Sequence, residues 1–263
     1  MLEIPIFGPD DGAAAVLAGA QRLELNRAGS YAVGGLTPTL PELTALLASL
    51  STPRPPIRIM IRPRGAPPGD QQRPDFLYTP FELRAMHASI TEFVHSNLLS
   101  PSLGDGFVFG VLSQDGSGGV GIDVQACTAL VRSAAGWACV LHRAFDDVLA
   151  AGEGVVGGEQ VGVVRGCGFR GVLTSGGRGD AMGNVGVLGR VVREGREVGV
   201  EVVVGGGVRA GDVRGLGEGA GLEEGRGGGV WFHSSCLVGE GEGKRFDVGE
   251  VGRLREEIRR VLG

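Results

Sequence analysis

Several features that define common protein classes are scarce or missing in this sequence. It has four cysteines in 263 residues and no Cys-x-x-Cys pair, which argues against a disulfide framework and a structural zinc knuckle. No apolar run approaches the roughly 18 residues that a membrane helix needs, so we expect no membrane partner. The first residues show neither a basic stretch nor a small-residue cleavage site, which favours a cytoplasmic protein.

Charge of one sign is not concentrated anywhere along the chain. The 25 basic and 30 acidic residues give a net charge of −5, and no basic block stands out. This distribution argues against a nucleic-acid partner. The sequence also has neither a G-x-x-x-x-G-K-[ST] phosphate loop nor an H-E-x-x-H metal motif.

Glycine, in contrast, is abundant, with 50 residues concentrated in the second half. We interpret the stretches GEGAGLEEGRGGG (217–229) and GEGEG (239–243) as flexible, solvated connections between elements. The clusters GGLTPT (34–39) and GGGVR (205–209) are the exceptions, as they can serve a site.

Eight short apolar runs alternate with segments of helical character. The runs are rich in Val, Ile, Leu and Phe, as strands are, and polar residues, Gly or Pro bound them. They are LEIPIF (2–7), RLELN (22–26), IRIMIR (57–62), FVFGVLS (107–113), ACVLH (138–142), RGVLT (170–174), VEVVVG (200–205) and VWFH (230–233). We expect helices over 11–20, 39–50, 123–136 and 250–262, from their alanine content, capping residues and amphipathic period.

Strand and helix therefore alternate eight times in about 250 residues, which is the size of a TIM (β/α)8 barrel with parallel strands. A doubly wound open sheet is the alternative, but FGPDDG, which follows the first run, lacks its G-x-G-x-x-G turn. We expect one α/β domain over residues 1–263. The segment 63–106 is longer than a simple crossover and is interpreted as a long loop over the barrel mouth.

Polar, titratable side chains stand at the ends of these runs. In a barrel of this kind, the carboxyl ends of the strands face a common pocket. The stretch CVLHRAFDD (139–147) thus places His142, Arg143 and Asp146 at the mouth. The eighth run adds His233 and Ser234 there.

Strand alternation assigns the charged residues within the runs to the barrel interior. In LEI and LEL, Leu and Ile suit the helix layer, so Glu3 and Glu24 point inward. Arg62 and Arg64 share the parity of Met60, and we expect them to approach the two carboxylates, since buried charges need partners. For Glu3, a purely structural salt-bridged plug of the barrel is an equal alternative.

The sixth to eighth runs predict an anion site. Thr174, Ser175 and Gly176 offer hydroxyls and backbone N–H groups, and Gly206, Gly207 and Arg209 follow the seventh run. Loops after strands seven and eight are the usual phosphate cradle of such barrels. A tight turn is the alternative explanation of the glycines.

Taken together, the strand-end motifs resemble those of the CutC copper homeostasis family. LEI, RLEL with GGLTPT, IRPRG, LHRAFD, VLTSG, GGGVR and FHSS occur in the family's order over residues 2–235. The resemblance implies a TIM barrel, a cytosolic setting, a role in copper tolerance and Cu(I) handling, and a self-associating protein. Its signature positions are Glu3, Glu24, Arg62, Arg64, His142, Arg143, Asp146, Thr174, Ser175, Gly176, Arg209, His233 and Ser234.

The chain differs from the family where cysteines are usually proposed for copper. Pro5 and Asn26 occupy those places. The best remaining metal ligands are His142, His233 and Cys236, for which we expect weak copper binding because Cu(I) prefers sulfur.

Two main functions stay open. The first is copper homeostasis through Cu(I) binding, and the second is an enzyme that acts on a small phosphate or carboxylate substrate by acid–base chemistry. A catalytically silent scaffold is a third reading. The predicted catalytic residues are Glu24, His142, His233 and Asp146. The predicted anion-binding residues are Glu3, Arg62, Arg64, Arg143, Thr174, Ser175, Gly176, Gly206, Gly207, Arg209 and Ser234.

Overall fold

Eight parallel strands close into a barrel in the computed structural model, which describes residues 1–67, 75–152, 158–222, 229–239 and 244–262. The ring order is β1, β2, β3, β4, β7, β8, β9 and β10, and β10 pairs with β1 to close it. The strands are β1 (Leu2–Phe7), β2 (Arg22–Asn26), β3 (Ile57–Met60), β4 (Gly106–Phe109), β7 (Ala138–Leu141), β8 (Gly171–Thr174), β9 (Glu201–Val204) and β10 (Val230–His233). All eight coincide with predicted runs, so the TIM-barrel prediction is confirmed.

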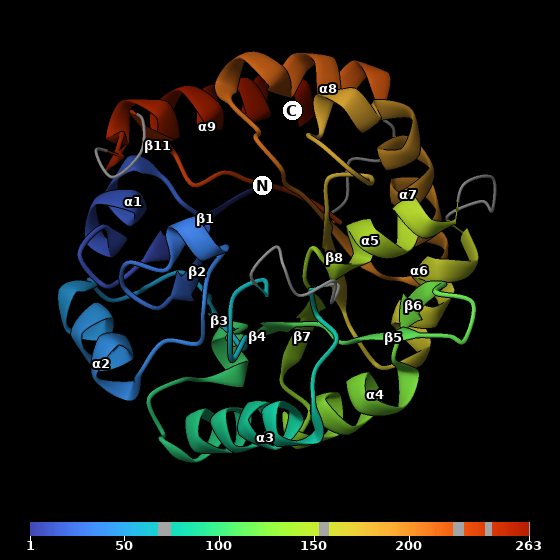
Figure 1. Ribbon diagram of the computed structural model, residues 1–263. Coiled ribbons are helices and arrows are strands. Elements are labelled where there is room, and N and C mark those ends of the chain that lie inside the picture. The colour runs from blue at the N-terminus through green and yellow to red at the C-terminus, as the bar shows by residue number, and fades with distance from the viewer. Residues whose placement is uncertain (68–74, 153–157, 223–228, 240–243, 263) are drawn as a thin grey trace.

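Helices form the outer ring of the molecule (Figure 1). They are α1 (Gly12–Ala18), α2 (Leu40–Ser49), α3 (Pro80–His95), α4 (Val124–Ser133), α5 (Ala144–Ala151), α6 (Gly158–Gly166), α7 (Val185–Val198), α8 (Val213–Gly219) and α9 (Val248–Leu262). The four helices predicted from the sequence correspond to α1, α2, α4 and α9. Among the residues described, no helix combines the length and the apolarity needed to cross a membrane.

The segment 63–106 is not a simple long loop, because it contains the 16-residue helix α3. Thr79 begins this helix with a capping box in which Thr79 and Glu82 bond each other's backbone, and Pro80 occupies the first turn. Two short hairpins, β5 (Leu112–Gln114) with β6 (Val120–Ile122) and β11 (Leu237–Val238) with β12 (Arg245–Phe246), lie outside the barrel sheet. The predicted 107–113 run is therefore split between β4 and β5.

The glycine-rich segments were only partly predicted. Gly217 and Gly219 lie in α8, so the first part of the 217–229 stretch is helical and not a flexible connection. At Gly217 an added Cβ would lie 2.2 Å from Val261, so the glycine allows α8 to approach α9 closely. Residues 223–228 and 240–243 lie outside the described part of the chain.

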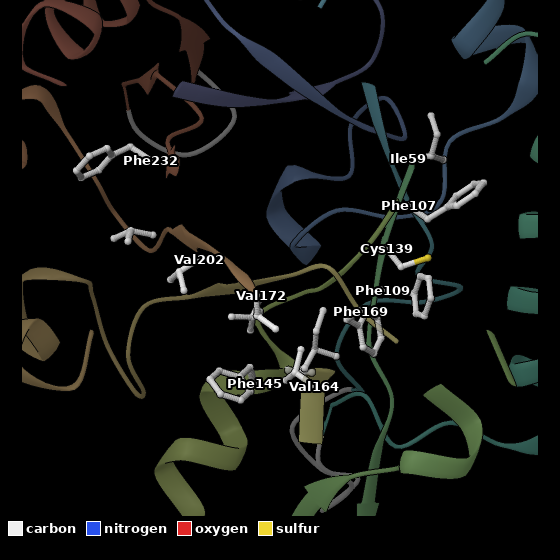
Figure 2. Packing of buried hydrophobic residues seen from close by; sticks show 14 of the residues in the cluster. Ile59, Phe107, Phe109, Cys139, Phe145, Val164, Phe169, Val172, Val202 and Phe232 are labelled. Atoms are coloured by element: carbon white, nitrogen blue, oxygen red, sulfur yellow. The ribbon is translucent and has the colours of Figure 1, made fainter. Parts of the chain in front are cut away.

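The main core lies between the barrel and its helices. Alternation along β1 and β2 directs Leu2, Ile4 and Leu23 into this layer, where each is fully buried. Figure 2 shows the same layer on the other side of the barrel, with Phe107, Phe109, Cys139, Phe169 and neighbouring residues packed together. The opposite parity faces the barrel interior, where six residues form a second cluster: Met60, Val108, Val140, Leu173, Val203 and Trp231.

Candidate functional site

A cavity of about 740 Å³ opens at the carboxyl ends of the barrel strands. Its size suits a small-molecule ligand. Ten predicted site residues line it: Glu24, Arg62, His142, Arg143, Asp146, Gly206, Gly207, Arg209, His233 and Ser234. The other predicted residues, Glu3, Arg64, Thr174, Ser175, Gly176 and Cys236, do not line it.

Glu3 and Glu24 both point into the barrel and are buried, as alternation predicts. The partner of Glu3 is Arg22, whose Nε donates to Glu3 Oε2 and whose Nη1 donates to Glu201 Oε1 at 2.8 Å. His233 Nδ1 lies 2.7 Å from Glu3 Oε1. Burial alone would raise the pKa of Glu3, but Arg22 and the bond to His233 outweigh it and lower the pKa to about 2.

The expectation that Arg62 and Arg64 approach these carboxylates is wrong. Arg62 donates to Asp75 Oδ2 at 2.7 Å, and Arg64 Nε donates to Glu82 Oε1 at 2.6 Å. Strand β3 ends at Met60, so strand parity no longer directs the side chains that follow. The two arginines instead pair with Asp75, which precedes α3, and with Glu82 in the first turn of α3.

Glu24 lines the cavity and has one buried carboxyl oxygen without a partner in the described part of the chain. Asn26 Nδ2 donates to Glu24 Oε1 at 3.0 Å, whereas Oε2 is buried and has no partner among the described residues. Burial raises the pKa of Glu24, and nearby Glu3 adds to the rise while His233 opposes it. For His233, burial alone would lower the pKa, but Glu3 and Glu24 raise it above the usual value. The cavity therefore holds two adjacent groups whose pKa values both shift upward.

Asp146 organises the β7–β8 side of the mouth. Its Oδ1 accepts from the Thr174 hydroxyl at 2.5 Å and from the Ser175 backbone at 2.9 Å. Its Oδ2 accepts from the Ser175 hydroxyl and from Arg143 Nε, both at 2.8 Å. Because both carboxylate oxygens are already occupied, the geometry suits Asp146 for holding Arg143 and Ser175 in place.

The loop after β9, residues 205–209 (the glycine loop), contributes Gly206 to Arg209 to the cavity wall. Gly206 and Gly207 have φ values of 93° and 80°, a region that glycine adopts readily. Their N–H groups have no acceptor among the residues described. Ser234 donates to Val208 O at 2.7 Å and so joins this loop to the end of β10. Arg209 Nη1 is buried without a partner. Gly176, in contrast, already donates its N–H to Thr174.

One group of possible metal ligands occurs in the described part of the chain. Ligand atoms of Glu3, Glu24 and His233 lie within 4.8 Å of one another. The set predicted from the sequence, His142, His233 and Cys236, is not brought together in this way. Cys236 is fully buried, and its Sγ lies 3.7 Å from Ser234 Oγ.

Comparison with known proteins places the chain in a family. Residues 1–229 match the model of the CutC family. The chain belongs to this family. A CutC protein of Rhizobium meliloti is 32% identical over 91% of this chain and 82% of its own length. A Drosophila melanogaster relative, named copper homeostasis protein cutC homolog, is 33% identical over 73% of this chain and 63% of its own length.

A solved structure supports the same fold. The crystal structure of a CutC protein from Streptococcus agalactiae superposes with a TM-score of 0.70 at 24% identity, covering 89% of this chain and 97% of that one.

Sequence reasoning missed three residues that shape this CutC mouth. Arg22 shares the parity of Glu24 in RLELN, which was a usable signal. Asp75 and Phe76 lie in a segment with no regular pattern, so nothing in the sequence marked them. Both line the cavity.

Proposed function

We propose that this CutC family member serves in copper homeostasis and that its barrel mouth binds a small anionic ligand, on which Glu24 and His233 carry out acid–base chemistry. The name of the Drosophila relative supports the cellular role. The proposal also takes the protein as cytoplasmic, self-associating and built as one domain over residues 1–263, as the sequence and the family resemblance suggest. It includes no nucleic-acid partner.

The observation that carries the chemical part is the unpaired Glu24 Oε2 beside His233 in the cavity wall. A carboxyl group that transfers protons needs a free oxygen and a pKa nearer to neutral than its usual value. Glu24 meets both conditions, since Asn26 occupies only Oε1 and burial raises its pKa. His233 is held through Nδ1 by Glu3, so its Nε2 is the nitrogen left for a ligand.

The glycine loop and its neighbours supply N–H donors and positive charge for an anion. The free N–H groups of Gly206 and Gly207 and the unpaired Nη1 of Arg209 belong to residues of the cavity wall. Arg143, half-exposed at 46%, adds a further positive charge. Backbone N–H groups with guanidinium groups are typical ligands of phosphate. Strands β9 and β10 are the seventh and eighth of the barrel, after which phosphate commonly binds.

Thermal unfolding in inorganic phosphate tests this proposal, with chloride at equal ionic strength as reference. A ligand at ten times its dissociation constant stabilises a protein by about 1.4 kcal/mol, which for a chain of this size raises the Tm by roughly 2–4 °C. We expect Arg143→Gln to lose most of this shift. The control Arg132→Gln, an exposed position in the last turn of α4 and outside the cavity wall, should keep it. No phosphate-specific shift in the unaltered protein would refute the anion site.

Direct metal binding is the second candidate, favoured by the group of Glu3, Glu24 and His233. Its donors are two carboxylates and an imidazole, whereas Cu(I) prefers thiolate or thioether. All four thiols are buried and none belongs to the group. Glu3 is moreover occupied by Arg22 and His233. These residues do not fit Cu(I); they suit a divalent ion that accepts oxygen and nitrogen ligands.

A competition titration separates the two candidates. With Cu(I) at controlled thiol concentration, we expect no stoichiometric binding that depends on Glu24 or His233. Zn²⁺, which accepts oxygen and nitrogen ligands, is titrated as the matched probe. Its binding to the unaltered protein is compared with its binding to the variant Glu24→Gln. Tight Cu(I) binding that His233→Ala abolishes would establish the metal function and contradict our reading of the donor set.

A further inference from the structure

His142 is held in one neutral form by its surroundings. The backbone N–H of Ala144 donates to His142 Nδ1 at 3.2 Å. The accepting nitrogen carries a lone pair, so in the neutral ring the proton is on Nε2. Burial first, and then the charge of Arg62, lower the pKa of His142 to about 3. At neutral pH, His142 is thus a fixed N–H donor.

This donor has nothing to bind within the described part of the protein. His142 is only 3% exposed, and its Nε2 is buried without a partner. A buried donor without an acceptor costs about 1–3 kcal/mol, so such groups call for an explanation. The site is built closely around the ring: at Gly110, an added Cβ would lie 2.9 Å from His142 Nδ1.

Arg62 presents a second donor of the same kind. Its Nη1 donates to the carbonyls of Val33 and Gly35, and its Nη2 donates to Asp75. These bonds fix the guanidinium plane and leave Nε buried, with no hydrogen-bond partner among the residues that the structure describes. The ring of Phe76 packs against both residues, with its centroid 4.5 Å from that of His142 and 5.3 Å from Arg62 Cζ.

We infer that Arg62 Nε and His142 Nε2 form a two-donor site for a carboxylate or similar oxyanion group of the ligand. This inference rests on the proposed anion function of the mouth. Both residues line the cavity, and in this proposal the Phe76 ring, which packs against both residues, rotates aside to admit the ligand oxygens.

The position of the two-donor site specifies the shape of the ligand. Strands β3 and β9 lie four steps apart in the ring of eight, on opposite sides of the mouth. Arg62 follows β3 and His142 follows β7, on either side of β4, whereas the glycine loop follows β9, three steps from β4. Glu24 and His233 belong to β2 and β10. These two strands lie on the part of the ring that runs from β3 through β1 to β9. The ligand is therefore a small molecule with an anionic group at each end, a phosphate at the glycine loop and a carboxylate at the two-donor site.

Binding of a two-ended probe tests this inference. We compare 3-phosphoglycerate, which has a phosphate and a carboxylate, with inorganic phosphate by calorimetric titration. Because hydrogen bonds to charged groups are the stronger ones, we expect 3-phosphoglycerate to bind about tenfold more tightly or better. His142→Phe should remove this advantage and leave phosphate binding unchanged, whereas His142→Gln, which keeps an N–H donor, should retain much of it. Phe76→Ala should bind 3-phosphoglycerate at least as well as the unaltered protein.

Nuclear magnetic resonance of the His142 ring nitrogens gives an independent readout. We expect a neutral ring with the proton on Nε2 from pH 5 to pH 9, and an Nε2 signal that moves with 3-phosphoglycerate but not with phosphate. A ring that titrates near pH 6.5, or equal affinities for the two probes, would overturn the two-donor site. Phosphate binding without the carboxylate advantage would leave the proposed function standing, whereas carboxylate-dependent binding without phosphate binding would remove the glycine-loop site alone.

Discussion

The charge of Glu3 inside the barrel leads to a quantitative prediction for stability. Glu3→Gln replaces a carboxylate that contacts Arg22 and His233 by a neutral group of nearly the same shape. The ionised form is favoured in the folded protein because its pKa falls from 4.5 to about 2. A difference of about 2.5 pH units corresponds to roughly 3 kcal/mol. The variant should lose about this free energy of unfolding at pH 7.

The sign of the pH dependence follows from the lowered pKa. The stabilisation by Glu3 is complete well above pH 4.5 and is lost as the pH falls toward 2, because protonation then occurs first in the unfolded chain. At pH 3, the linkage relation gives a remaining difference of about 1.4 kcal/mol in the free energy of unfolding between the unaltered protein and Glu3→Gln. The variant and the unaltered protein should therefore converge in acid.

Urea unfolding at pH 7, 5 and 3 measures this difference. Glu201→Gln is the matched control, since Glu201 pairs with the same Arg22 but its side chain is 26% exposed, and we expect a smaller loss. A difference between Glu3→Gln and the unaltered protein that stays constant from pH 7 to pH 3 would refute the reasoning. So would a loss below about 1 kcal/mol at pH 7, because breaking a buried pair costs more than this.

Three further predictions concern the mouth and the thiols. Asp146→Asn places an amide donor against groups that already donate, so we expect a loss of about 1–3 kcal/mol in urea unfolding and a weaker phosphate shift; an unchanged protein would contradict the role given to Asp146. Gly206→Ala should destabilise more than Gly207→Ala in thermal unfolding, because its Cβ would lie 2.6 Å from Ser175 Cβ, whereas at Gly207 the nearest atom is at 3.6 Å; equal effects would argue against this geometry. The four thiols should react with Ellman's reagent only on unfolding, because all four are buried and burial raises the pKa of Cys139 to about 12. Fast reaction of the native protein would contradict the burial of the thiols.

The barrel could be predicted from the sequence because its signal is local and repeated. Each strand is a short apolar run with Gly, Pro or polar residues at its ends, and helices follow with recognisable caps. The inward direction of Glu3 and Glu24 was predictable for the same reason, since pleating is regular within a strand. Helix α3 carried a comparable signal in Thr79, Pro80 and Glu82, which the length of the segment obscured.

The pairing of charges could not be predicted in this way. Strand alternation predicted that Arg62 and Arg64 point into the barrel. Strand β3 ends before both residues, and they pair with Asp75 and Glu82 instead. Arg22 begins its strand, yet it is 2% exposed and pairs with Glu3 of the neighbouring strand β1 and with Glu201 of β9. Such contacts depend on which strands are neighbours, and no single run contains that information.

The tautomer of His142 depends on a contact with Ala144, two residues further along the chain. The N–H of Ala144 turns back to Nδ1 only because α5 begins directly after the strand end. The sequence therefore predicted the presence of His142 at the mouth and left its tautomer, and hence its chemistry, undetermined.

The central claim is that the barrel mouth is an anion-binding site, and anomalous diffraction from crystals soaked in tungstate tests it most directly. Tungstate is an oxyanion of phosphate-like geometry with a strong anomalous signal. We predict a peak within the cavity, in contact with the backbone N–H groups of Gly206 and Gly207 and near Arg143 and Arg209. A cavity without a peak, in a protein that binds tungstate elsewhere on its surface, would contradict it.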